Sequence, residues 1–486
     1  MITRIKIDGF KSLLNTELYL GTFTCIAGAN AAGKSNFFDA ILFLSRLADD
    51  TILQAAKSIR SENLKHSNIN DIFYKSGSER YNSMKFEIDM LIPKEAIDDL
   101  GQTAEATITS LRYSLELKFN EENLDRELIE LVKEELIPIT QTETKNSLKF
   151  DYSSQWLNSV LYGRRSTKAP FISTENEKIK LHQDGSKGRT SEFIAEKMPR
   201  TLLSTVTAES PTAFLVRQEM RNWKMLQFEP SAMRHPNSTY EIKNAEITTN
   251  GSNLPATTYR LSNEKKNIDV YQTLTNKLKE LVSDVDEINV DKDEKRDLLT
   301  FQVKFKSGLI LPAQSLSDGT LRFLALAIIN EDNKSKGLIC LEEPENGINP
   351  KKIKEMVKLL EDMATDTDYE VNDDNSLRQV IINSHSPLVV GLVPDNSLLL
   401  AKEKEIFNEQ FNKKIKYTGF ASLPNTWRDG YLEKTTLGEI IAYLDNSLSE
   451  KNIIQTNTPL KTEKNTKQAK RRTVAENINQ FKLNLQ

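Results

Sequence analysis

The stretch Phe23-Thr24-Cys25-Ile26-Ala27-Gly28-Ala29-Asn30-Ala31-Ala32-Gly33-Lys34-Ser35-Asn36 decides the fold of this chain of 486 residues. Its first five residues are continuously apolar or β-branched, which predicts a short strand buried on both faces. The next eight, from Gly28 to Ser35, match the phosphate-binding pattern G-x-x-x-x-G-K-[ST]. Apolar residues at helical spacing then predict a helix from Ser35 to about Leu47.

The order of strand, loop and helix places this pattern where a phosphate-binding loop requires it. Glycines let backbone N–H groups curl around phosphate oxygens without a Cβ in the way. The start of the following helix presents free N–H groups and the positive end of its dipole to the same anion. We expect Lys34 to reach the β- and γ-phosphates, the Ser35 hydroxyl to bind Mg²⁺, and Asn36 to lie beside them. The loop therefore predicts binding of ATP with Mg²⁺.

A second element points to hydrolysis. The apolar residues Leu338–Leu341 run directly into Glu342 and Glu343. Such a strand delivers acids to its carboxyl edge, where ligands bind in open α/β sheets. Glu342 can hold the Mg²⁺ shell, while Glu343 can polarise the attacking water. Adjacent glutamates alone are usually surface charge, but downstream of a phosphate loop they predict an active site.

Four elements in this order resemble the SMC/RecF-like branch of ABC ATPases. More narrowly, they resemble the bacterial AAA15/AAA21-type ATPases, which include the OLD-like proteins. The elements are the phosphate loop, Leu316-Ser317-Asp318-Gly319-Thr320, Glu342-Glu343-Pro344-Glu345-Asn346-Gly347, and Asn383-Ser384-His385-Ser386-Pro387. The resemblance covers roughly 1–75 and 225–400. It implies an α/β ABC-type P-loop ATPase head, a mixed sheet with flanking helices, interrupted by a largely helical or mixed insertion without a long coiled coil.

The resemblance also implies roles for single residues. Ser317, Asp318 and Gly319 resemble the signature motif, which touches the γ-phosphate of ATP bound to the opposite subunit. Glu343 resembles the catalytic glutamate, and His385 resembles the switch histidine. Alone, Ser-Asp-Gly would be an ordinary turn and helix cap, and a lone histidine a satisfied polar residue. Together they imply ATP held between two copies of the chain, in a homodimer or a higher homo-oligomer.

Some positions depart from the family pattern. Glu342 stands where many relatives have Asp, Asn349 where many have His, and Ala31 where glycine is frequent. The longer side chain of Glu342 changes the reach of the expected metal ligand. Gln218 and Gln227 are both candidates for the glutamine that relatives place near the γ-phosphate.

The N-terminal and middle regions predict further elements. Alternating residues 2–7 predict a strand paired with 18–20, and Lys11 just beyond it is a candidate to approach the phosphates. The stretches 85–90 and 112–119 predict antiparallel strands. Helical periodicity predicts helices over 121–136 and 256–286. A hairpin is expected at Lys178–Leu181, with its turn at Asp184-Gly185.

These elements suggest five regions. They are an N-terminal ATPase lobe (1–75), inserted strands and helices (76–225), a C-terminal ATPase lobe (226–400), a C-terminal subdomain (401–450) and a flexible basic tail (451–486).

Composition limits the function classes. Lys and Arg total 65 against 69 Asp and Glu, so a formal net charge of −4 gives no global attraction to nucleic acid. Apolar runs fall short of the ~18 residues of a membrane span, and the N-terminus does not look like a signal peptide. Cys25 and Cys340 are expected to be buried, reduced thiols. We therefore expect a cytoplasmic protein without a membrane partner.

Three biological roles fit such an ATPase. The first is a bacterial anti-phage defence subunit, like the Septu and PARIS ATPases, that controls a separate nuclease or toxin. The second is a RecF-like DNA-repair protein, for which Arg164, Arg165, Lys168 and the tail would contribute basic surface. The third is a transporter ATPase subunit, against which the Glu-Glu-Pro-Glu-Asn-Gly stretch and the inserted middle argue.

Overall fold

The computed structural model describes residues 1–29, 31–59, 69–77, 79–98, 101–120, 128–163, 169–184, 190–265, 269–409, 411–436 and 439. Arg164, Arg165, Lys168, Gly185 and the tail from Lys451 lie outside this part of the chain.

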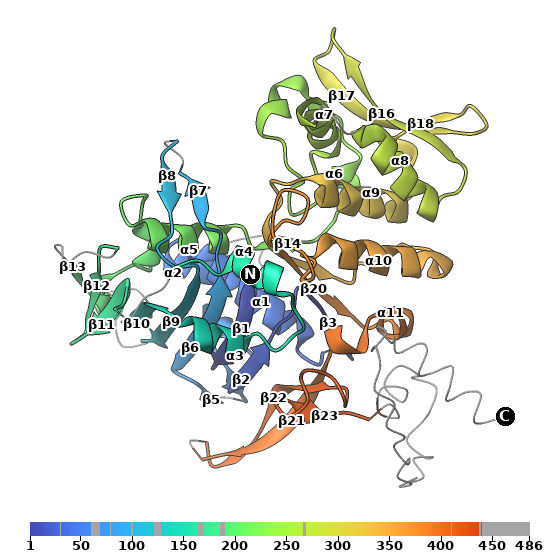
Figure 1. Cartoon of the computed structure of the whole chain (residues 1–486). Helices are drawn as coiled ribbons and strands as arrows, with labels where there is room; N and C mark the ends of the chain where they lie inside the picture. Colours follow the sequence, from blue (N-terminus) through green and yellow to red (C-terminus); the bar gives the residue numbers. More distant parts are fainter. Residues whose placement is uncertain are drawn as a thin grey trace.

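A seven-stranded sheet forms the centre of the molecule (Figure 1). Its order is β14 (Lys224–Leu226), β19 (Gly337–Glu342), β20 (Arg378–Ser384), β3 (Phe23–Gly28), β21 (Leu398–Asn408), β22 (Lys413–Ser422) and β23 (Glu433–Lys434). The first five strands are parallel, and β22 runs antiparallel to β21. Because parallel strands end at one edge, the residues that follow β3, β19 and β20 meet there.

An antiparallel eight-stranded sheet covers one face of the central sheet. Its order is β13 (Ser191–Ile194), β12 (Lys178–Leu181), β11 (Ile172–Glu175), β10 (Ile129–Pro138), β9 (Ser110–Phe119), β6 (Ser83–Leu91), β1 (Ile2–Asp8) and β2 (Thr16–Tyr19). Short hairpins β4 (Lys75–Ser76) with β5 (Glu79–Arg80), and β7 (Glu95–Ile97) with β8 (Thr103–Glu105), lie apart from it. The described part of residues 76–225 is thus built mainly on strands.

A third sheet stands at the upper right of Figure 1, beyond α9. It contains β15 (Asn237–Ser238), β17 (Leu298–Phe305), β16 (Val285–Asp293) and β18 (Ile310–Pro312). The helices named in the described part of the chain are α1 (Lys34–Arg46), α2 (Ile52–Lys57), α3 (Gln141–Ser147), α4 (Ser154–Val160), α5 (Pro211–Arg221), α6 (Pro230–Met233), α7 (Leu254–Glu264), α8 (Val270–Leu281), α9 (Asp318–Glu331), α10 (Ile353–Met363) and α11 (Pro387–Leu392).

Side chains of the central sheet alternate between two hydrophobic cores. Ile26 of β3 packs with α1 and the eight-stranded sheet, whereas its neighbour Cys25 packs with α9 and α10. Strand β19 alternates in the same way, and Cys340 faces the first core. Both cysteines are free and buried, as predicted, and burial raises the pKa of the Cys340 thiol. The continuous apolar character of these strands follows from burial on both faces.

Two helix predictions in the middle region need correction. Where a helix was predicted over 121–136, the structure has strand β10 from Ile129, paired with β9, and residues 121–127 lie outside the described part. Of its charged residues Glu134 is buried, whereas Glu130, Lys133 and Glu135 are partly exposed. The helix predicted over 256–286 is two helices, α7 and α8, followed by β16. The hairpin predicted from Lys178–Leu181 is confirmed, because β12 pairs antiparallel with β13 and Asp184 lies in the connection between them. Strand β12 also pairs with β11 through a tight turn in which Asn176 and Glu177 both have positive φ.

The expectation of no long coiled coil agrees with the described residues, where the longest helix is α9 with 14 residues. In that part of the chain, no helix is both long and apolar enough to cross a bilayer.

A buried ion pair fastens α7 to the end of α9. Arg260 Nη2 donates to Asp332 Oδ2 at 2.5 Å, and each side chain is only 2% exposed. Arg260 also contacts Glu264, which is 45% exposed. The pair therefore ties the lobe that contains the third sheet to the core.

Arg260→Met should destabilise the fold by about 3–5 kcal/mol, because it leaves the Asp332 carboxylate buried without its cation. Urea unfolding of the variant measures this loss. Glu264→Gln is the matched control and should cost less than about 1 kcal/mol, since its partner contact is exposed. Equal losses of unfolding free energy in the two variants would show that the buried ion pair does not contribute more to stability than the exposed contact.

Candidate functional site

The phosphate-binding loop connects β3 to α1 at the carboxyl edge of the central sheet. Ala31 and Gly33 have positive φ values of 66° and 88°, which turn the chain sharply before the helix begins at Lys34. No side chain caps the start of α1, and its first turn carries no acid. Free N–H groups therefore remain available at this helix end for an anion. Asn30 lies outside the described residues.

Lys34 folds back over its own loop. Its Nζ donates to the carbonyl oxygens of Gly28 at 2.6 Å and Ala29 at 2.8 Å. Burial lowers the pKa of Lys34, while the nearby carboxylates of Glu343 and Glu342 act in the opposite direction. Its partners are neutral carbonyls rather than a carboxylate, so the ammonium can turn to a phosphate without breaking an ion pair.

Gly33 is required by a close approach of β22. A Cβ on this residue would stand 1.9 Å from Thr418 Oγ1 and 2.8 Å from Ser12 Oγ. The two hydroxyls are 2.6 Å apart, and Asn36 Nδ2 donates to Ser12 Oγ at 2.7 Å. These polar side chains brace the loop from the N-terminal strand and from β22. The candidate Lys11 instead pairs with Asp39 Oδ2 at 2.7 Å.

The two predicted acids lie at the end of β19. Glu343 has a positive φ of 47°, and its N–H donates both to the carbonyl of Asn383 and to Asn383 Oδ1 at 3.0 Å. Asn383 Nδ2 also donates to Glu342 Oε1 at 3.3 Å. Asn383 at the end of β20 thus holds the turn in which the two carboxylates diverge.

Glu343 contacts two polar side chains. His385 Nδ1 lies 2.7 Å from Glu343 Oε1, and Asn346 Nδ2 donates to Glu343 Oε2 at 3.0 Å. All three residues are partly exposed, with His385 44% and Glu343 34% accessible. Next to them, burial raises the pKa of Glu345, whose Oε1 accepts from Ser384 Oγ. The geometry brings together the predicted glutamate and histidine, 42 residues apart in sequence.

The predicted signature residues begin α9. Ser317 is the N-cap, and its Oγ accepts from Thr320 N at 3.3 Å. Asp318 Oδ1 accepts from Arg234 Nη2 at 2.5 Å. Gly319 packs on the turn after β19, because a Cβ here would stand 2.2 Å from the carbonyl oxygen of Gly347. Ser317 and Asp318 are exposed to solvent.

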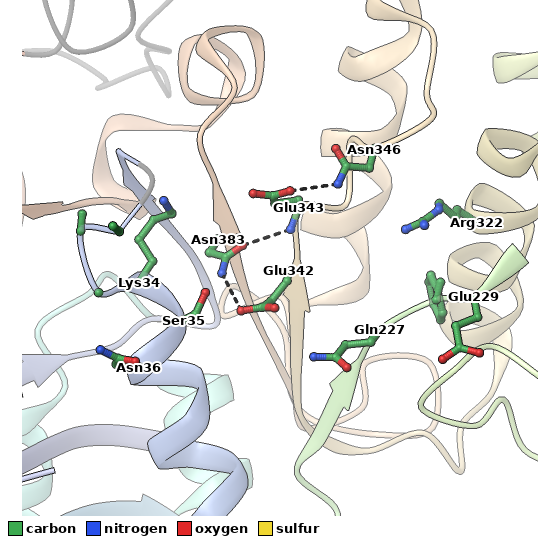
Figure 2. A pocket seen from close by; sticks show the side chains of 14 residues that line it. Lys34, Ser35, Asn36, Gln227, Glu229, Arg322, Glu342, Glu343, Asn346 and Asn383 are labelled. Carbon is green, nitrogen blue, oxygen red and sulfur yellow. Dashed lines mark hydrogen bonds between the residues drawn. The ribbon is translucent and has the colours of Figure 1, made fainter. Parts of the chain in front are cut away.

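A cavity of about 680 Å³ joins the loop to the acids. It is lined by Ala31, Ala32, Gly33, Lys34, Ser35, Asn36, Gln227, Phe228, Glu229, Arg322, Glu342, Glu343, Asn346 and Asn383. Figure 2 shows Lys34 and Ser35 on one side, Glu342 and Glu343 in the middle, and Arg322 with Glu229 on the far side. Ser317 and His385 are not among the lining residues, and of the two glutamine candidates only Gln227 is.

Sequence reasoning gave no role to five lining residues, which are Phe228, Glu229, Arg322, Asn346 and Asn383. Asn346 lies inside the quoted Glu-Pro-Glu-Asn-Gly stretch, and Arg322 lies five residues after Ser317 on a predicted helix, so both had a signal in their spacing. Glu229 follows Gln227 by two residues in a loop without regular pattern. Only the folded chain brings these residues to one cavity.

The lining includes oxygen donors suited to Mg²⁺. The Ser35 hydroxyl at the start of α1 and the Glu342 carboxylate at the end of β19 both line the cavity. Mg²⁺ prefers oxygen ligands and usually takes one or two carboxylates together with substrate phosphates. This donor set fits a magnesium ion that binds together with a nucleotide.

The sheet order, the loop and the acids define a P-loop ATPase head of the α/β class. The family profile AAA_21, described as "AAA domain, putative AbiEii toxin, Type IV TA system", matches residues 23–391. The chain belongs to this family. The search of curated proteins found no match.

Solved structures with a similar arrangement are SMC head domains. One is an Smc head bound to the C-winged helix domain of ScpA, with 15% identity, a TM-score of 0.43, and coverage of 87% of this chain and 98% of that chain. Another is an Smc head with an extended coiled coil, bound to the C-terminal domain of ScpA derived from Pyrococcus furiosus, with 14% identity, a TM-score of 0.39, and coverage of 87% and 96%. A third is the SMC head from Thermotoga maritima, with 10% identity, a TM-score of 0.35, and coverage of 86% and 97%.

Gly33→Ala should weaken ATP binding at least about tenfold, because the Cβ meets Thr418 and the positive φ strains an L-residue by ~1–2 kcal/mol. A fluorescent ATP analogue titrated into the protein measures this affinity. Gly308→Ala is the control, since Gly308 has a similar φ of 85° with nothing within 4 Å of its Cβ position. Unchanged ATP affinity in Gly33→Ala would remove the loop from the nucleotide site.

Proposed function

We propose that this protein binds and hydrolyses ATP in a site completed by a second copy of the chain. One observation carries the proposal. The cavity gathers the phosphate loop, Glu342, Glu343 and Gln227, while the exposed Ser317 begins α9 outside its lining. A signature serine that acts within its own chain would be expected to line that cavity. Its exposure instead supports contact with ATP on a partner copy.

The residues of this chain divide the work of hydrolysis. Lys34 gives up its two carbonyl partners and binds β- and γ-phosphate oxygens. The N–H groups at the start of α1 bind the same phosphates. Ser35 and Glu342 hold Mg²⁺, which supplies neutralisation of the phosphate charge. Glu343 accepts a proton from the attacking water as a general base. His385 lies against Glu343 and orients its carboxylate.

We propose that ATP binding in this shared site changes the association of the two copies and acts on a separate effector. The family description names a toxin and a Type IV toxin–antitoxin system, which supports a role in bacterial conflict. The effector would be a nuclease or toxin on another polypeptide, and the assembly would act in the cytoplasm as part of an anti-phage defence system. The matched region, residues 23–391, includes the phosphate loop, the two acids and His385.

A RecF-like DNA-repair ATPase is the alternative function. It requires a basic surface that faces DNA, since phosphate contacts dominate affinity for nucleic acid. The formal net charge of −4 does not favour such a surface. The basic residues Arg164, Arg165 and Lys168 lie outside the described part of the chain.

Glu343→Gln should slow ATP hydrolysis by about 10²–10⁴-fold, because the amide cannot accept the proton of the attacking water. ATP affinity should change little, since the amide keeps the shape of the side chain. Phosphate production and ATP binding, measured on the same preparation, separate the two effects. Hydrolysis at the wild-type rate would exclude Glu343 as the general base.

The stalled Glu343→Gln protein also separates the two biological roles. Purified with ATP and Mg²⁺ from its native cells, it should retain a stoichiometric nuclease-like or toxin-like companion, which native mass spectrometry would identify. Lys34→Ala, which should bind no nucleotide, is the control for association that does not depend on ATP. Recovery of a homo-oligomer that carries only nucleic acid would contradict the defence role and favour DNA repair.

A further inference from the structure

The far end of the cavity holds a cation that the proposed hydrolysis has not used. Arg322 lies on the second turn of α9, and its guanidinium points toward Asn346 and Glu343 (Figure 2). Its Nε is buried and has no hydrogen-bond partner among the described residues. An arginine in this state retains several N–H donors for an incoming oxyanion.

The neighbours of Arg322 do not neutralise it. Glu229 lines the same end of the cavity, yet no ion pair within 4.0 Å joins it to Arg322 in the described structure. Gln227 and Asn346 add neutral amide groups to this end. By contrast, Arg234 near the start of α9 is already engaged by Asp318 and the carbonyl of Leu316. Arg322 is therefore the cation of this helix that faces the cavity with its donors unused.

The order of groups along the cavity indicates which anion reaches Arg322. Lys34 and Ser35 lie at one side, the acids lie in the middle, and Arg322 lies beyond them. In phosphoryl transfer, the attacking and leaving oxygens stand roughly in line with the phosphorus. When ADP occupies the loop, the transferred phosphate moves away from it, toward the attacking water and Glu343. The groups beyond Glu343 are thus the first that released phosphate meets.

We propose that Arg322 forms an inorganic-phosphate subsite at the end of the cavity, which receives the phosphate as it separates from ADP. The inference rests on the proposed ATPase function. Arginine suits this task because its planar guanidinium can donate two parallel hydrogen bonds to a phosphate. Asn346 and Gln227 supply amide donors from either side. The negative charge of the Glu229 carboxylate repels the phosphate. This repulsion keeps the affinity for phosphate low enough for the product to leave.

The subsite requires no reactant beyond those of ATP hydrolysis. Water adds its oxygen to the γ-phosphorus, the bond to the β-phosphate oxygen breaks, and Glu343 takes the proton. The products are ADP and inorganic phosphate, with no further reactant. Arg322 makes no covalent bond, and it acts by holding the phosphate away from the ADP leaving oxygen so that the two do not recombine.

The test measures phosphate binding to the full chain loaded with ADP and Mg²⁺, by calorimetric titration with inorganic phosphate. Arg322→Gln should weaken phosphate binding at least about tenfold, the loss expected for a charged hydrogen-bonding partner. Arg322→Lys should recover part of the affinity, and Glu229→Gln should strengthen it. ADP affinity should stay the same in all three variants, which shows that the loop remains folded. Arg296→Gln, on an exposed turn, is the matched control.

The outcomes distinguish this inference from the proposed function. Unchanged phosphate affinity in Arg322→Gln, with ADP bound normally, would overturn the subsite and leave the ATPase proposal intact. Failure of the wild-type chain to bind ADP would overturn both. If Arg322→Gln lowers the affinity for ATP tenfold but leaves phosphate binding to the ADP form unchanged, Arg322 contacts the γ-phosphate before cleavage, and the product subsite is wrong.

Discussion

The parallel pairing of β3, β20 and β19 is the constraint on which the candidate site depends. Ser384 lies opposite Ala27, and Asn383 lies opposite both Ile26 and Glu342. This register brings the end of β3 to the same edge of the sheet as the ends of β19 and β20, which begin more than 300 residues later in the sequence. Asn383 then bonds to Glu342 and to the backbone of Glu343, so its amide sets the positions of both acids.

Helix α9 connects the interior of the site to its exterior. Its first residues, with Ser317 as cap, face solvent, while Arg322 one turn later lines the cavity. Gly319 rests directly on Gly347, in the turn that follows Glu343. A movement of this turn would therefore displace the start of α9. The opposite end of α9 is held by Asp332, which pairs with Arg260, so α9 links the site to α7 and the region of the third sheet.

The sequence predicted the parts of the structure that local chemistry controls. Continuous apolar runs identified β3 and β19, and the glycine pattern identified the loop between β3 and α1. The prediction of a helix over 121–136 was wrong because pairing with β9 makes Ile129–Pro138 a strand, and this tertiary pairing overrides helical propensity. Glu229 could not be assigned from spacing, because its place in the cavity depends on how the loop after β14 packs. Lys11, a candidate to approach the phosphates, pairs with Asp39 on α1.

A site shared between two copies is the central claim, and a complementation assay tests it most directly. Ser317→Arg removes only the contribution that one chain makes to its partner, whereas Lys34→Ala removes only the contribution it makes to its own cavity. Each variant alone should be inactive. Mixed in equal amounts, they should recover up to about a quarter of the wild-type ATPase rate, since half of the pairs are mixed and each holds one intact site. No recovery, with mixed pairs present by native mass spectrometry, would contradict a site completed by the second chain.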